Sequence, residues 1–234
     1  MKFLLSTISF LAIFTNICFS QTKDTNIYDL KAKKILDQLS QKMNNRNFQI
    51  NFQYTFYNAQ DSSKQSLKGY LYAKGEKYKI IIPFAEFFSD GTNTYAYNKK
   101  ANEMTIQPTD PINEQVYTPN KMLNMYQKGF KYSLKGEATG DFKQKINGKL
   151  TKKNLTCFVI DLYPEKPKTS EITIIRIWIE KTKLDLISIK FQYSSGFEEV
   201  IEVLDQKLDI PISDELFKFD TNKYPKNIDI TKIE

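Results

Sequence analysis

The pattern of apolar and polar residues changes its period early in the chain. Apolar residues first recur at spacings of three and four, as on one face of a helix: Ala32, Ile35, Leu36, Leu39 and Met43. These positions predict a helix from Asn26 to Met43, capped by Thr25 or Asn26 and ended by Asn44 and Asn45. From Phe48 to Phe56 every second residue is apolar, which predicts a half-buried strand.

Further strands follow at short spacing. The sequence predicts them at residues 66–74, 77–82, 86–89, 94–97, 103–107, 130–134, 155–163, 171–180, 186–193 and 197–204, with a helical turn at 213–216 and an extended piece at 217–219. Turns are expected at Gly75, Gly91 and Asn98, and a longer glycine-rich turn at 135–140. Short connections favour antiparallel neighbours. The fold class is therefore mainly β with helices (α+β), and so many strands predict a sheet that curls or splits.

A second helical segment interrupts the strands. Thr118 is a cap before Pro119, and Gly129 ends the segment. Its apolar residues are Met122, Leu123, Met125 and Tyr126, a flexible set that suits either a movable cover over an apolar cavity or ordinary core packing.

Several strands are apolar on both faces. In the strand at 171–180, Ile174 and Trp178 lie on one face and Ile175 and Ile177 on the other. One face then packs a core, while the other contacts helices or encloses a ligand. Arg176 shares the Trp178 face and needs a partner, which could be a helix or an anionic head group.

Composition argues against most catalytic classes. The 234 residues include no histidine, which excludes Ser-His-Asp and Cys-His catalysis and imidazole metal ligands. The net charge is +7, but only Arg46 and Arg176 are arginines, which disfavours a nucleic-acid site. No phosphate-binding, dinucleotide-binding or calcium motif is present. We therefore expect no enzyme activity, no cofactor, no metal and no nucleic-acid partner.

The N-terminus resembles a secretory signal peptide. Lys2 precedes an interrupted apolar stretch, and small residues predict cleavage after Ser20. Lipidation at Cys18 is the less favoured alternative, because Ile17 is bulky. Residues 21–234 contain no linker or repeat and are interpreted as one domain. In the mature chain Cys157 would be the one cysteine, which we expect to be a buried strand residue.

Three stretches of the chain carry motifs in a recognisable order. They are the hairpin Ser89-Asp90-Gly91-Thr92-Asn93-Thr94-Tyr95-Ala96-Tyr97-Asn98, the preceding strand Leu67-Lys68-Gly69-Tyr70-Leu71-Tyr72-Ala73-Lys74, and the ending Phe217-Lys218-Phe219-Asp220 followed by Tyr224-Pro225 and Ile228-Asp229-Ile230. These stretches resemble the LolA family of periplasmic outer-membrane lipoprotein carriers. Their order and spacing extend the resemblance over essentially the whole chain. The abundance of Lys, Asn and Tyr is similar to the Bacteroidetes branch of the family.

The resemblance implies an unclosed antiparallel β-barrel of about 11–12 strands with a helical lid. It implies a monomeric periplasmic carrier whose apolar interior takes the acyl chains of lipoproteins, received from an inner-membrane ABC transporter and delivered to an outer-membrane acceptor. Better-known members have an arginine where Gly75 stands, so their way of latching the lid does not transfer. The alternative is a sensor or interaction module on the same lidded half-barrel, or a carrier of a different lipid.

The expected cavity residues are the apolar positions of the predicted strands and of the second helical segment. They are Phe52, Phe56, Leu71, Ile80, Ile82, Met122, Leu123, Met125, Tyr126, Ile174, Trp178, Ile189 and Phe191, with Arg176 as a polar contact for the lid or a head group.

Overall fold

The computed structural model describes residues 28–44, 46–58, 60–109 and 119–233. The predicted signal peptide, residues 1–20, and the predicted caps Thr25 and Asn26 lie outside these ranges. None of the helices in the described ranges is long and apolar enough to cross a membrane.

The described strands form one sheet of twelve, in the order β12-β6-β5-β4-β3-β2-β1-β11-β10-β9-β8-β7. Their bounds are Phe48–Asn58 (β1), Ser63–Lys74 (β2), Lys77–Ile82 (β3), Ala85–Ser89 (β4), Asn93–Asn98 (β5), Glu103–Pro108 (β6), Phe130–Ile146 (β7), Lys149–Pro164 (β8), Ile172–Glu180 (β9), Leu186–Tyr193 (β10), Phe197–Leu208 (β11) and Asp229–Lys232 (β12). The two end strands of this order, β12 and β7, do not pair with each other, so the sheet is open. The predicted fold class, an unclosed and mainly antiparallel sheet with helices, is confirmed.

One pairing departs from the antiparallel pattern. β12 lies parallel to β6, with Asp229 opposite Glu103 and Lys232 opposite Ile106. A parallel pair needs a long connection, and the whole of the chain from β7 to β11 separates these two strands in sequence.

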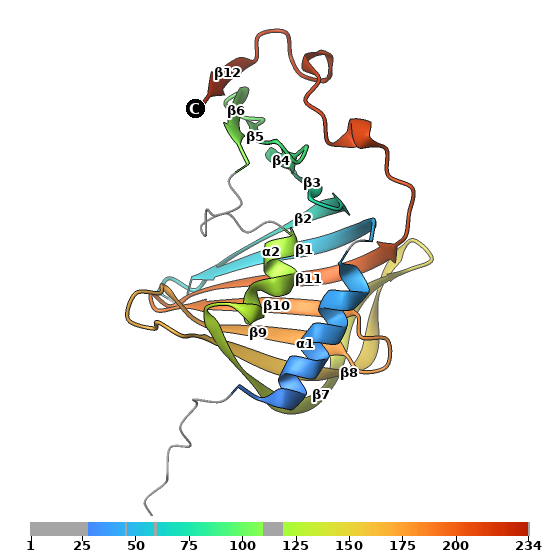
Figure 1. Cartoon of the computed structure of the whole chain (residues 1–234), viewed down its shortest axis with the longest axis vertical. Helices are drawn as coiled ribbons and strands as arrows, with labels where there is room; N and C mark the ends of the chain where they lie inside the picture. Colours follow the sequence, from blue (N-terminus) through green and yellow to red (C-terminus); the bar gives the residue numbers. More distant parts are fainter. Residues whose placement is uncertain (1–27, 45, 59, 110–118, 234) are drawn as a thin grey trace, which may run out of the picture.

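The helix α1 (Leu30–Met43) crosses one face of the sheet, together with the short helix α2 (Pro119–Asn124) and the 3-10 turn η1 (Met125–Gln127) (Figure 1). We call this face the inner face. The start of α1 differs from the prediction, because Asp29 is the cap: its carboxylate accepts from the backbone N–H groups of Lys31 and Ala32. Asp29 also accepts from the N–H of Leu134 at 3.1 Å, which fixes the start of the helix on β7.

The main core lies between α1 and the inner face. It contains Leu36 and Met43 of the helix and Ile160, Ile175 and Ile189 of the strands, all buried. The residues predicted at helical spacing are therefore those that bury the helix, and the burial of each Leu, Ile or Met side chain among them contributes roughly 1.5–3 kcal/mol.

A second cluster lies on the outer face of the sheet. Leu155, Cys157 and Ile187 are buried there, with Phe142 and Trp178 packed against them. Cys157 is a free, buried thiol, as predicted for a strand residue, and burial raises its pKa to about 11.

Phe142 reaches the outer cluster because β7 and β8 are longer than predicted. The expected glycine-rich turn at 135–140 is part of β7 instead, and the next turn comes at Asn147 and Gly148. The ladder with β8 shifts register between Leu134 and Gly136, and Gly136 has φ +116°. The glycine therefore marks a β-bulge that bends the strand rather than a turn that ends it.

The strands β3 to β6 form an arm that extends away from the helix-covered part of the sheet (Figure 1). Phe88, Tyr95, Tyr97 and Met104 are buried on its outer face beneath the C-terminal segment. That segment contains two 3-10 turns, η2 (Asp214–Leu216) and η3 (Thr221–Lys223). The predicted turn at 213–216 is confirmed. The predicted extended piece at 217–219 is not a strand, and its Phe219 ring stacks on Tyr95 of the arm.

Candidate functional site

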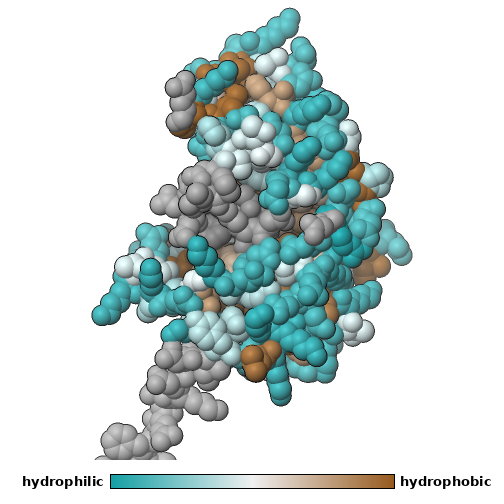
Figure 2. All heavy atoms as spheres, viewed as in Figure 1, coloured by the Kyte–Doolittle hydropathy of each residue, from teal (hydrophilic) through white to brown (hydrophobic). Residues whose placement is uncertain are grey.

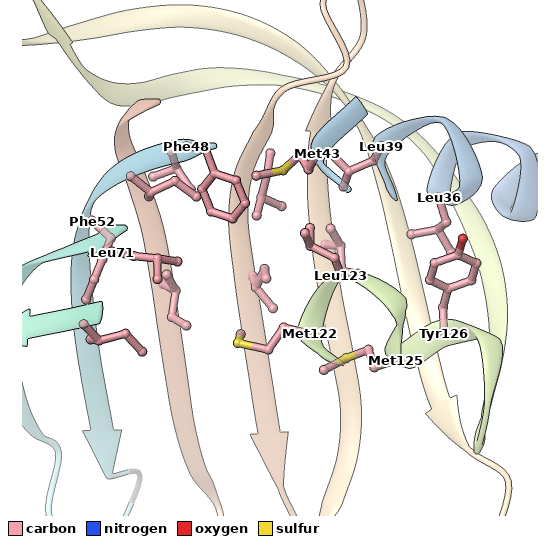
Figure 3. A pocket seen from close by; sticks show the side chains of 17 residues that line it. Leu36, Leu39, Met43, Phe48, Phe52, Leu71, Met122, Leu123, Met125 and Tyr126 are labelled. Atoms are coloured by element: carbon pink, nitrogen blue, oxygen red, sulfur yellow. The ribbon is translucent and has the colours of Figure 1, made fainter. Parts of the chain in front are cut away.

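An apolar cavity lies between the inner face, α1 and the α2–η1 segment (Figure 3). Each of these elements contributes apolar side chains. The lining residues are Leu36, Leu39 and Met43 of α1; Phe48, Ile50 and Phe52 of β1; Leu71 of β2; Ile80 of β3; Met122 and Leu123 of α2; Met125 and Tyr126 of η1; Ile177 of β9; Leu186 and Ile189 of β10; and Ile201 and Val203 of β11.

The register of the sheet explains why these strand residues meet. Directly opposed residues on neighbouring strands share a face. Ile50 is opposite Leu71, and Leu71 is opposite Ile80, which carries one apolar row from β1 to β3. On the other side, Ile177 is opposite Ile189 and Ile189 opposite Ile201, which carries a second row from β9 to β11.

The cavity is not filled by the protein's own side chains. Its volume is about 130 Å³, roughly ten times the 10–15 Å³ that one water molecule needs. Among the described residues that line it, the only polar side-chain atom is the Tyr126 hydroxyl, which donates to Asp37 at 2.8 Å. An apolar lining of this kind offers water almost no hydrogen-bond partners and favours hydrocarbon.

The apolar inner face continues beyond the cavity onto the arm. Phe87 of β4 is opposite Ile80 and is 40% exposed, and Phe84, in the turn before it, is 55% exposed. Large apolar side chains exposed next to an apolar cavity are typical of an interaction surface. Seen from the helix side, the surface of the described residues is otherwise mostly hydrophilic (Figure 2).

Side-chain hydrogen bonds attach the α2–η1 segment to α1. The Ser40 hydroxyl donates to Asn124 Oδ1 at 2.7 Å, and Asn44 Nδ2 donates to the same oxygen at 3.3 Å. At η1, Tyr126 donates to Asp37. We call these contacts the α1 latch. A neutral hydrogen bond contributes about 1 kcal/mol and one to a charged group about 1.5–3 kcal/mol, so the segment is held by contacts that break singly at modest cost.

The ionisation of the latch residues follows from their neighbours. The Lys33 ammonium, 2.8 Å from Asp37, lowers the pKa of that carboxyl group, and the Tyr126 hydroxyl lowers it further. Burial raises the pKa of Tyr126, and the bond to Asp37 raises it as well. At neutral pH the latch therefore consists of a carboxylate that accepts from a neutral phenol.

The structure brings together eight of the predicted cavity residues: Phe52, Leu71, Ile80, Met122, Leu123, Met125, Tyr126 and Ile189. Three others lie outside the lining. Phe191 is buried in the main core, Phe56 stacks on Phe197 with ring centroids 5.2 Å apart, and Ile82 is half-buried on the arm.

The predicted face of β9 is wrong. Trp178 packs against the outer cluster, and Ile174, which alternates with Ile175 and Ile177, shares its side of the strand. Ile175 and Ile177 belong to the main core instead. Both faces of β9 are apolar because each packs against a cluster, so the composition of the strand alone could not distinguish them.

Arg176 is on the outer face with Trp178 and has a protein partner. Its Nε donates to Asp161 Oδ1 at 2.6 Å and its Nη2 to Oδ2 at 2.8 Å, a bidentate pair with a carboxylate that is only 1% exposed. Tyr163 donates to the same carboxylate at 3.1 Å. Asp161 is thus the partner that Arg176 needs, and the expected lid or head-group contact of Arg176 is corrected.

Several lining residues are not among the predicted ones. Leu36, Leu39 and Met43 belong to the predicted apolar face of α1, and Phe48 and Ile50 belong to the same alternation as Phe52. Their periodicity marks them as buried, but it does not distinguish a residue next to a cavity from one in a filled core.

The described residues contain no group of three or more Cys, Asp or Glu side chains arranged to hold a metal ion. Apart from the Tyr126 hydroxyl, the described residues that line the cavity present apolar side chains, which can enclose a hydrocarbon.

The comparisons with known proteins concern the fold. No protein-family model and no curated protein matches the sequence. The chain is similar in structure to an uncharacterized conserved protein from Thermus thermophilus, with a TM-score of 0.54 and 12% identity over 87% of this chain and 99% of that chain. This likeness shows a shared fold.

Two further similarities are weaker. LolA superfamily protein NE2245 from Nitrosomonas europaea gives a TM-score of 0.39 and 12% identity over 80% of this chain and 97% of that chain. A chain of the Pseudomonas aeruginosa MucA/MucB complex gives 0.45 and 9% over 82% and 62%. At these values neither likeness extends to family or function, and the LolA resemblance continues to depend on the sequence motifs.

Proposed function

We propose that the protein is a periplasmic carrier that binds the acyl chains of lipoproteins in the cavity and moves them from the inner to the outer membrane. The observation that carries the proposal is an unfilled, almost entirely apolar cavity beneath a weakly attached helical segment. The sequence motifs shared with the LolA family support it, as does the signal-peptide pattern.

The energetics suit a carrier. Each methylene removed from water contributes about 0.8 kcal/mol, so a long acyl chain left in water costs on the order of 10 kcal/mol. A lining without directed polar bonds can offset that cost for chains of different length and does not hold any one of them by a specific contact. The cavity takes a whole chain only if α2 and η1 move outward, and the flexible side chains Met122 and Met125 allow this without a loss of contact.

Ligand binding tests the proposal directly. Delipidated protein should bind a fluorescent fatty acid saturably, with an affinity that rises with chain length. Leu123→Asp should weaken binding at least about tenfold, because a charge in the apolar cavity is costly. Leu30→Asp is the matched control, since Leu30 is 79% exposed and outside the cavity. Absence of saturable binding across several acyl ligands would refute the proposal.

Depletion in the parent cell separates a carrier from the alternative of a sensor or a protein that handles another lipid. Loss of a lipoprotein carrier should leave lipoproteins in the inner membrane, as measured by membrane fractionation. Loss of a sensor should change only a response. An inner-membrane ABC transporter and an outer-membrane acceptor are the partners that the proposal requires, and binding of a single monomer to each would be expected.

A further inference from the structure

The hairpin of β7 and β8 continues past its neighbours and folds over the outer face of the sheet. Gln144 Nε2 donates to the carbonyl oxygen of Val203 at 2.8 Å, and Phe142 packs on the outer cluster. The acceptor is free because β11 has a bulge next to Val203. The hairpin is thus positioned on the side of the sheet opposite the cavity, and its tip is a separate surface.

The tip is a tight turn whose flanking residues are exposed. Asn147 and Gly148 have φ of +49° and +80°, as a two-residue hairpin loop requires. All residues from 145 to 154 are exposed. They include two aliphatic side chains, Ile146 and Leu150, each 44% exposed. Large aliphatic residues on both sides of an exposed turn bury little within the protein, which suggests an outside partner.

The same hairpin carries a concentrated positive charge. Residues 142–160 contain five lysines, at positions 143, 145, 149, 152 and 153, and no acidic residue. Lys143 is 3.8 Å from Glu202, but Lys145, Lys149 and Lys152 form no ion pair within the described part of the chain. Lys68 and Tyr70 of β2 lie with Lys145 and Leu150 around a hollow between the tip and the sheet. The surface is therefore basic and apolar together.

The lysines and the exposed aliphatic side chains of the tip together indicate the kind of partner that it binds. A nucleic-acid site is built from polar and stacking contacts and favours arginine, whereas this tip has lysines and aliphatic side chains. Lysines beside exposed aliphatic residues are the pattern that binds anionic lipid surfaces, where the apolar groups enter the head-group region and the ammonium groups meet phosphates. We propose that the tip of the β7–β8 hairpin docks the protein on the surface of an anionic lipid bilayer.

The register of the hairpin gives the docking geometry. Lys145 is opposite Leu150 and Ile146 is opposite Lys149, so each face of the tip carries one aliphatic residue and one lysine. If the hairpin enters tip first, both aliphatic side chains reach the acyl boundary while the lysines, with their flexible stems, stay at the level of the phosphates. The docking surface is on the outer face, so it does not depend on the occupancy of the cavity or on the proposed carrier function.

Vesicle binding tests the proposal. The purified protein should sediment with vesicles of phosphatidylcholine and phosphatidylglycerol and not with phosphatidylcholine alone. Lys145→Gln/Lys149→Gln should lower the partition coefficient by roughly 20-fold, since each lysine near an anionic surface contributes about fivefold. Lys166→Gln/Lys168→Gln is the matched control: it removes the same charge from exposed positions in the turn between β8 and β9 and should change binding less than about twofold.

The aliphatic residues have their own test. Ile146→Ser/Leu150→Ser should weaken binding by about tenfold or more at constant charge, because two apolar side chains no longer leave water. In Ile146→Trp the added fluorophore should shift to the blue with anionic vesicles and be quenched by lipids brominated in the acyl chain. The wild-type protein, whose fluorescence comes from Trp178 at the outer cluster, gives the background signal. All variants are prepared with the same N-terminal segment, so that this segment cannot cause a difference in vesicle binding. Circular dichroism spectra check that each variant is folded.

Three results would overturn the proposal. The first is that the protein does not bind anionic vesicles, and the second is that the tip and control lysine variants lose vesicle binding equally. The third is that the aliphatic variants bind vesicles as the wild-type protein does and also keep undiminished binding to an oligonucleotide. The last result would assign the tip to a polyanion. Acyl-ligand affinity, measured in the same variants, should stay unchanged, so failure of the docking surface and failure of the carrier function give different results.

Discussion

At the scale of single residues, the two arginines of the chain have very different surroundings. Arg176 holds the buried carboxylate of Asp161 by two hydrogen bonds. Arg46 pairs with Asp209 at the surface, where the carboxylate side chain is 61% exposed. An exposed ion pair contributes little, whereas loss of one partner from a buried pair leaves an uncompensated charge.

Arg176→Met should therefore lower the free energy of unfolding by about 2–3 kcal/mol, because the Tyr163 hydroxyl is then the one side-chain partner of Asp161 among the described residues. Arg46→Met should cost less than about 1 kcal/mol. Urea unfolding followed by circular dichroism measures both. Replacement of the pair together, Asp161→Leu with Arg176→Met, should recover most of the loss. Equal losses at the two arginines would contradict this explanation.

Gly69 is required by a neighbouring ring rather than by its backbone conformation. A Cβ atom at this position would overlap the Phe52 ring and lie 2.9 Å from the carbonyl oxygen of Ile81. Phe52 lines the cavity, and Gly69 is directly opposite it on β2. The missing side chain thus gives room to a ring that would otherwise have to shift into the cavity.

Gly69→Ala should destabilise the protein by about 1–3 kcal/mol through overpacking. It should also weaken binding of long acyl ligands, because the displaced ring occupies cavity volume. Gly140→Ala is the control, since its nearest neighbour, the Phe142 ring, is 3.8 Å away. Thermal unfolding and a fatty-acid titration of both variants provide the comparison, and similar behaviour of the two would argue against the role of Gly69.

At the scale of elements, the α1 latch determines how readily the α2–η1 segment leaves the cavity. Among the described residues, Ser40, Asn44 and Asp37 supply its contacts on the α1 side. The short α2–η1 segment has little stability of its own, because isolated short helices are marginal in water. Its position therefore depends on the latch and on burial of its apolar side chains.

Ser40→Ala with Tyr126→Phe should release this segment while leaving the sheet intact. We expect the dissociation rate of a bound fluorescent fatty acid to rise by roughly tenfold or more, since each lost hydrogen bond contributes about 1 kcal/mol or more. Stopped-flow displacement measures the rate. Ser170→Ala is the control, because the Ser170 hydroxyl donates to Ile172 far from the latch. An unchanged rate in the double variant would mean that burial alone holds the segment.

The elements differ in how well the sequence predicts them. β3 and β10 have the predicted bounds, because turn residues limit them on both sides. The predicted start of α1 is wrong because Thr25, Asn26 and Asp29 are all good caps, and the choice of Asp29 depends on its bond to Leu134 in β7. The turn predicted around Gly136 is wrong because a bulge uses the same residue type.

The cavity is predictable in part for a similar reason. Alternation locates Phe52, Leu71 and Ile80 on one face of each strand. It cannot choose a face for β9, whose outer side packs against a hairpin more than twenty residues distant in sequence. A pattern of residues also does not predict that a core contains a cavity, because this depends on the distance between the helices and the sheet.

At the scale of the whole molecule, the arm has a separate small core and a separate cover. Phe219 stacks on Tyr95 with centroids 5.7 Å apart, and Tyr224 meets Tyr97 edge-on at 4.8 Å. These contacts lie on the outer face, whereas the cavity lies on the inner one. The stability of the arm and the affinity of the cavity should therefore respond to different residues.

Phe219→Ala should make the arm sensitive to proteolysis and lower the free energy of unfolding by about 2 kcal/mol. Acyl-ligand affinity should change less than about twofold (about 0.4 kcal/mol). Phe84→Ala is the stability control, since that ring is exposed. Limited proteolysis with mass spectrometry locates the cuts. A large loss of ligand affinity in Phe219→Ala would show that arm and cavity are coupled.

In the sheet formed by the described residues, the end strands β7 and β12 do not pair with each other, which affects how the sheet can deform. In a closed barrel, strand number and stagger fix the diameter, and widening requires a seam of hydrogen bonds to rupture. A sheet with two free margins can flatten or tighten by small changes in twist between neighbours, with every ladder bond kept. Wide and narrow ligands can then be accommodated with a similar free-energy cost of deforming the sheet.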